Sequence, residues 1–123
     1  MFSVTIRQHV MIAHSLPHPD FGPAQRLHGA TYVTDVTFYS EKLNAQQTVI
    51  DIALAHQALK DVLAPLNYQN LDELPQFEGQ LTTTEFIARY IHNEVKKAVT
   101  GHFSGRIKVR LGESHEAWAA YEA

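Results

Sequence analysis

The stretch MIAHSLPHPDFGPAQRLHGATYVTDVTFY, residues 11–39, decides the fold, because one extended segment ends in it and a second begins. Apolar residues alternate along residues 2–14, which predicts a strand, with a bulge near Gln8 and His9. LPHPDFGPAQ, residues 16–25, holds three prolines and a glycine and predicts a loop. β-Branched and aromatic residues fill residues 31–39, so a second strand can return beside the first as a hairpin.

The first helix is predicted in the segment that follows the two strands, where apolar residues recur. Asp51 can cap a helix that continues to about Ala64, because apolar residues recur there at helical spacing and Pro65 follows. Residues 66–81 carry no such period and predict a long loop.

A second helix begins at Thr82-Thr83-Thr84-Glu85, which fits the capping-box pattern. Its apolar stripe is predicted to be Ile87, Tyr90, Ile91, Val95 and Ala98. His56 on the first helix and His92 on the second have polar neighbours, which predicts surface positions for both.

The last segment predicts two more strands. Apolar and basic residues alternate over residues 107–111, and AWAAYE, residues 117–122, can form a short final strand. The order ββααββ predicts an α+β domain in which a four-stranded antiparallel sheet carries both helices on one face. Its two open edges favour pairing between subunits.

Composition limits the classes of function. A chain of 123 residues with 45% hydrophobic content predicts a single domain, residues 1–123. A net charge of -3 gives no field that would gather nucleic acid or an anionic membrane. No stretch has the apolar length of a signal peptide or a membrane span, so we expect a cytoplasmic protein. The absence of cysteine excludes disulfides, a thiolate nucleophile and thiolate metal ligands.

Two histidines are candidates for a metal site. His14 ends the first predicted strand and His28 precedes the second, so a hairpin would bring them together. Residue 30 would point the same way as His28, but it is Ala30, and catalytic zinc generally takes three protein ligands. His18 or Asp20 in the loop are alternatives for a third ligand, although a histidine between two prolines is typical of an exposed turn.

Four blocks of sequence resemble the 6-pyruvoyl-tetrahydropterin and 6-carboxy-tetrahydropterin synthase family. MIAHSLPHPDFGPAQRLHGATY is similar to its strand-end AAH, loop and LHGH-aromatic signature, and three further blocks follow in the family's order: VIDI (49–52), LTTTEFIARYI (81–91) and VRLGESHEAWAAY (109–121). The resemblance implies one pterin-synthase-like domain with a tunnelling fold (T-fold), in which the sheets of several subunits join into a barrel. It also implies a homotrimer or homohexamer with a pterin-like ligand bound between subunits.

The resemblance implies a binding role for four residues. Glu113 matches the glutamate that anchors the guanidine-like edge of the pterin, and a carboxylate can accept two parallel hydrogen bonds from such an edge. Thr83, Thr84 and Glu85 match residues that line the same pocket. The alternatives are helix capping for the residues at 83–85 and a solvated loop charge for Glu113.

The catalytic set that the resemblance implies is largely replaced. Family members hold zinc with three histidines and move protons with a cysteine and an Asp-His pair. The corresponding positions here are His14, His28, Ala30, Ala24, Asn67 and Tyr68, of which only the two histidines are retained. Alanine has no ionisable group and an amide cannot charge-stabilise a histidine, so we expect ordinary synthase chemistry to be lost and zinc to bind weakly or not at all.

Three functions follow from these observations. The first is a protein that binds a pterin-like heterocycle without converting it. The second is a zinc-dependent lyase of altered specificity with a rearranged metal site, in which Tyr68 donates a proton. The third is a structural oligomer in which both sites have decayed.

Overall fold

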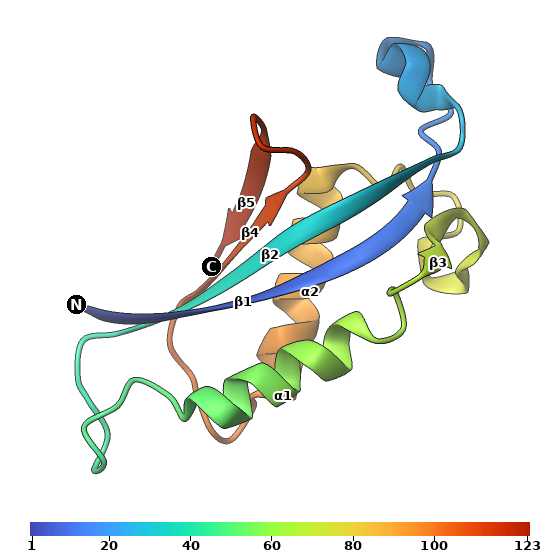
Figure 1. Ribbon diagram of the computed structural model, residues 1–123. Coiled ribbons are helices and arrows are strands. Elements are labelled where there is room, and N and C mark those ends of the chain that lie inside the picture. The colour runs from blue at the N-terminus through green and yellow to red at the C-terminus, as the bar shows by residue number, and fades with distance from the viewer.

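The computed structural model describes all residues, 1–123, as one mixed sheet with two α-helices on one of its faces (Figure 1). This confirms the predicted α+β class. The elements are β1 (Phe2–His14), β2 (His28–Ser40), α1 (Ile52–Leu63), β3 (Gln69–Asn70), α2 (Thr84–Ala98), β4 (Ile107–Gly112) and β5 (Trp118–Glu122). The strands lie in the order β3-β1-β2-β4-β5.

The β1–β2 hairpin is the longest feature of the sheet. Its antiparallel register is unbroken from Phe2 opposite Ser40 to His14 opposite His28. The predicted bulge near Gln8 and His9 is therefore wrong, because every residue of β1 has its own partner on β2. The second strand also begins three residues before the predicted start at Thr31, since residues 28–30 pair with residues 12–14.

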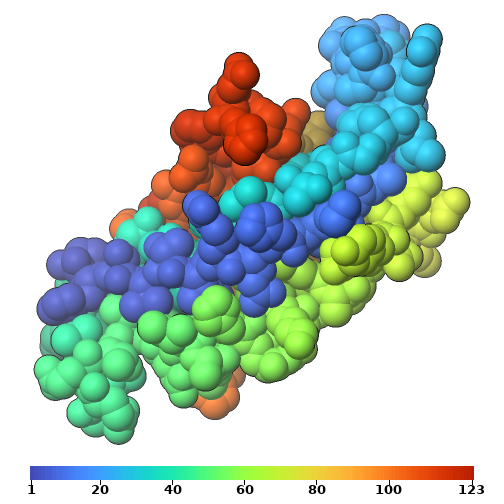
Figure 2. Space-filling model, viewed as in Figure 1, coloured from blue at the N-terminus to red at the C-terminus, as the bar shows by residue number.

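The loop that joins the hairpin strands forms a projecting arm, residues 15–27. It contains a 3-10 helix, Pro19–Gln25, with no buried residue. Figure 1 and Figure 2 show the arm standing clear of the rest of the molecule at the far end of the hairpin. The arm therefore extends the hairpin end of the sheet beyond the region that the helices cover.

The sheet has five strands and is mixed, which corrects the predicted four-stranded antiparallel sheet. β3 pairs in parallel with Ile12 and Ala13 of β1. It lies in the segment predicted as a long loop, together with short 3-10 helices at Leu71–Glu73 and Pro75–Phe77. A strand of two residues has no alternation of apolar and polar side chains, so the sequence pattern could not indicate it.

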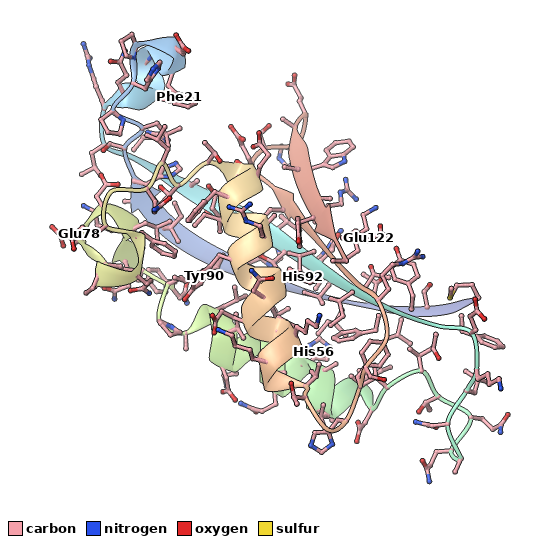
Figure 3. The ribbon with its side chains drawn as sticks, turned by 180° about the vertical axis from the view of Figure 1, so that it is seen from behind. Phe21, His56, Glu78, Tyr90, His92 and Glu122 are labelled. Carbon is pink, nitrogen blue, oxygen red and sulfur yellow. The ribbon has the colours of Figure 1, made fainter.

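The core lies between the helices and the even-numbered face of the hairpin (Figure 3). The strands contribute Ile6, Val10, Ile12, Tyr32, Val36 and Phe38, and the helices contribute Ala55, Leu59, Leu63, Ile87, Ile91 and Val95. The opposite face of the sheet is polar and carries a bidentate ion pair between Arg7 and Asp35, with nitrogen–oxygen distances of 2.7 and 2.9 Å. Neither α-helix has the length and apolarity that a membrane span requires.

The buried residues of α2 differ from the predicted stripe, most clearly at Ala98 and His92. Ala98 is exposed, whereas His92 is only 1% exposed. β5 covers this side of the helix, and the ring of Tyr121 packs edge-on against His92 with 4.8 Å between ring centres. The prediction of a surface His92 is therefore wrong, while His56 on α1 is exposed as predicted.

Candidate functional site

An open cleft of about 810 Å³ lies beside the free edge of β2. β4 ends at Gly112, opposite Val33, so residues 28–32 of β2 have no partner strand on that side. The cleft is lined by residues from the arm, β1, β2, the start of α2 and the β4–β5 turn, among them His14, Ala24, His28, Ala30, Thr83, Thr84, Glu85 and Glu113. Its volume is in the range of sites for small molecules, about 300–1,000 Å³.

The two candidate metal ligands do meet at this cleft. His14 and His28 are cross-strand partners, and their rings lie edge to face with 4.6 Å between centres. Nδ1 of His28 donates to the carbonyl oxygen of Arg26 at 2.7 Å, and Nδ1 of His14 lies 3.0 Å from the hydroxyl of Thr82. Each ring thus uses Nδ1 within the protein and leaves Nε2 for another partner, an orientation also found in histidines that ligate metals.

Burial lowers the pKa of His14. The residue is 4% exposed, and desolvation holds its pKa below the ordinary value, with a further decrease from the neighbouring His28. A neutral imidazole that donates through Nδ1 offers a lone pair at Nε2. His14 in its neutral form therefore presents an acceptor at the inner end of the cleft.

The donor set is one ligand short of a catalytic zinc site. Ala30 has no ligating atom, and no group of three His, Asp or Glu side chains is arranged to hold a metal. Neither of the alternatives, His18 and Asp20, lines the cleft. Instead, Nδ1 of His18 accepts a hydrogen bond of 3.1 Å from the backbone N–H of Asp20 and caps the 3-10 helix of the arm. Two imidazoles do not fit a zinc site that requires three protein ligands and an open position.

The opposite side of the cleft carries a carboxylate held by a hydroxyl. Thr84, the first residue of α2, donates from Oγ1 to Oε2 of Glu113 at 2.7 Å. Glu113 directly follows β4 and Oε1 makes no hydrogen bond within the protein. The carboxylate therefore has one oxygen fixed and one free at the edge of the cavity.

The start of α2 also performs the predicted capping, but one residue later than expected. Thr83 is the N-cap, and its hydroxyl accepts from the backbone N–H of Phe86 at 3.2 Å. Thr82 cannot serve as the cap because its hydroxyl bonds to His14. Thr83 and Glu85 border the cleft as well, so the same turn caps α2 and lines the cleft.

Tyr32 is a buried polar residue of the site to which the sequence pattern gave no role. It is 1% exposed and lines the cleft from β2. Burial raises the pKa of Tyr32 to about 12. The available signal was its place as the aromatic residue that closes LHGATY.

Asn67 and Tyr68 do not line this cleft. Oδ1 of Asn67 accepts from the backbone N–H of Met11 at 3.0 Å, and the backbone N–H of Tyr68 donates to the Met11 carbonyl at 2.7 Å. Both residues thus extend the outer edge of β1, across the hairpin from the cleft. Tyr68 has a left-handed backbone with φ 59°, and its side chain is 76% exposed.

The hairpin, the two helices on one face and the cleft at the free edge of β2 define an α+β domain of the T-fold class. The model of the 6-pyruvoyl tetrahydropterin synthase family matches residues 3–123, and the chain belongs to this family.

Solved structures show the same fold. The 6-pyruvoyl tetrahydropterin synthase of Caenorhabditis elegans is 24% identical with a TM-score of 0.84, covering 100% of this chain and 97% of that one. The enzyme from Plasmodium vivax is 15% identical with a TM-score of 0.83, covering 99% and 97%. An uncharacterized protein from Wolinella succinogenes is 15% identical with a TM-score of 0.73, covering 98% and 97%. A sequence search of curated proteins finds no match.

Proposed function

We propose that this chain binds a pterin-like heterocycle in the cleft and that ordinary synthase chemistry has been lost. The observation that carries the proposal is the Glu113 carboxylate, which is fixed at Oε2 by Thr84 and free at Oε1. The amino group and adjacent ring N–H of a pterin are parallel donors that match a carboxylate, and such charge-assisted bonds are about twice as strong as neutral ones. Family membership supports this choice of ligand.

The residues that would perform the chemistry are absent from the same cleft. Ala24 and Ala30 line it but can neither move a proton nor ligate a metal. Asn67 supports the edge of β1 through its amide oxygen. Recognition without conversion is therefore the function that these residues support best.

A ring of subunits is the assembly that the sheet edges support. β3 pairs only with Ile12 and Ala13, so most of the outer edge of β1 is open, and the outer edge of β5 is open as well. β5 is antiparallel to β1 within the sheet, so subunits placed side by side in the same orientation could join β5 to the next β1. Cyclic closure would remove both edges, and we propose a homotrimer or a homohexamer of two such rings.

The binding proposal is tested by titrating pterin into the purified protein and following its fluorescence. Glu113→Gln should raise the dissociation constant about tenfold, because it removes the charge from a hydrogen bond to the ligand. Glu116→Gln, on the same exposed turn, is the matched control and should bind like the wild type. Equal affinities for the wild type and Glu113→Gln, or no binding by the wild type, would reject the proposal.

A further inference from the structure

A buried threonine holds the carboxylate at the edge of the cleft. Thr84 is 7% exposed, while Glu113 lies on the exposed β4–β5 turn. Thr84 donates from Oγ1 to Oε2 of Glu113 at 2.7 Å. The two residues come from α2 and the end of β4, so the tertiary fold rather than local sequence brings them together.

The direction of the hydrogen bonds follows from the number of protons. A threonine hydroxyl has one proton and can accept as well as donate. Thr84 gives its proton to Glu113, so it has none for a ligand.

We propose that Thr84 is a positioning residue that acts on the ligand through Glu113, an inference that rests on the binding function proposed above. A glutamate on an exposed turn samples several rotamers, and ordering such a side chain on binding lowers affinity. The bond from Thr84 to Oε2 selects one rotamer before the ligand arrives.

The consequence is selectivity for the amino edge of the heterocycle. Pterin places an amino group beside a ring N–H, and both donors fit a correctly oriented carboxylate. Lumazine has an oxygen in place of that amino group and loses one of the two donors. Loss of positioning should therefore weaken pterin binding far more than lumazine binding, whereas a general loss of structure would weaken both.

The test compares dissociation constants for pterin and lumazine, measured by fluorescence, in four forms of the full chain: wild type, Thr84→Val, Thr84→Ala and Thr84→Ser. We expect Thr84→Val to weaken pterin binding about tenfold and lumazine binding less than about twofold. Thr84→Ala also removes the hydroxyl and should show the same selectivity. Thr84→Ser keeps the hydroxyl and should stay within about twofold of the wild type for both.

Three results would overturn the inference while the binding function stands. They are equal losses of affinity for the two heterocycles, no loss of pterin affinity in Thr84→Val, and a failure of Thr84→Ser to retain pterin affinity. If the wild type binds neither heterocycle, both the inference and the proposed function are refuted. Thermal melting identifies a variant that fails to fold. If Thr84→Val does so, the selectivity of Thr84→Ala decides the outcome.

Discussion

Removing the Thr82 hydroxyl should destabilise the fold more than its single hydrogen bond suggests. Thr82 is 2% exposed and His14 is 4% exposed, and the bond between them is 3.0 Å long. Thr82→Val keeps the shape but leaves the buried Nδ1 of His14 without a partner, which costs about 1–3 kcal/mol. With an unfolding entropy of about 2.1 cal/mol/K per residue, the chain's 123 residues translate this into a Tm about 4–12 °C lower.

Differential scanning calorimetry at pH 7.5 measures this change. Thr5→Val is the matched control, because Thr5 hydrogen-bonds to Thr37 at 2.7 Å on the exposed face, where water can replace the lost partner. Its Tm should change by less than about 2 °C. If the Tm of Thr82→Val falls by no more than that of Thr5→Val, the result would refute the view that the hydrogen bond to His14 is buried and cannot be replaced by one to water.

Three further outcomes are expected. The folded-state pKa of His14 is lowered, so its neutral form stabilises the fold above a pH of about 6.5, and this stability is lost as pH falls through the folded-state pKa. His14→Gln removes this titration and should therefore reduce the decrease of Tm between pH 7.5 and 5. An unchanged decrease of Tm would contradict His14 as its cause. Protein purified without a histidine tag should contain far less than one zinc per chain by elemental analysis, and one zinc that is lost in both His14→Ala and His28→Ala would instead favour the rearranged lyase. Light scattering should give the mass of a trimer or hexamer, whereas a monomer at micromolar concentration would contradict assembly through β1 and β5.

The sequence was sufficient to predict elements with a strong local signal. The alternating residues of β1, the apolar period of α1 and its Asp51 cap, which accepts from the N–H of Ala53 at 2.9 Å, all depend on neighbours in the chain. Family blocks also indicated several of the residues that line the cleft, including His14 and Glu113.

The structure differs from the predictions where contacts between residues distant in sequence determine the local structure. Thr82 fits a capping box, but His14 lies within reach in the folded chain and takes its hydroxyl, so Thr83 becomes the cap. His92 has polar neighbours along the chain and is nevertheless buried, because β5 lies over that side of α2. The orientation of the Glu113 carboxylate depends on Thr84, which is far from it in sequence and donates to it at 2.7 Å in the fold.

The most direct test of the central proposal is a crystal structure of the protein with pterin. The binding account predicts the ring in the cleft beside β2, with its amino edge about 2.7–2.9 Å from the Glu113 carboxylate and no metal between His14 and His28. A ring bound elsewhere, or one whose amino edge avoids Glu113, would contradict it. A zinc ion on the two histidines with a third ligand from a neighbouring subunit would favour the lyase instead.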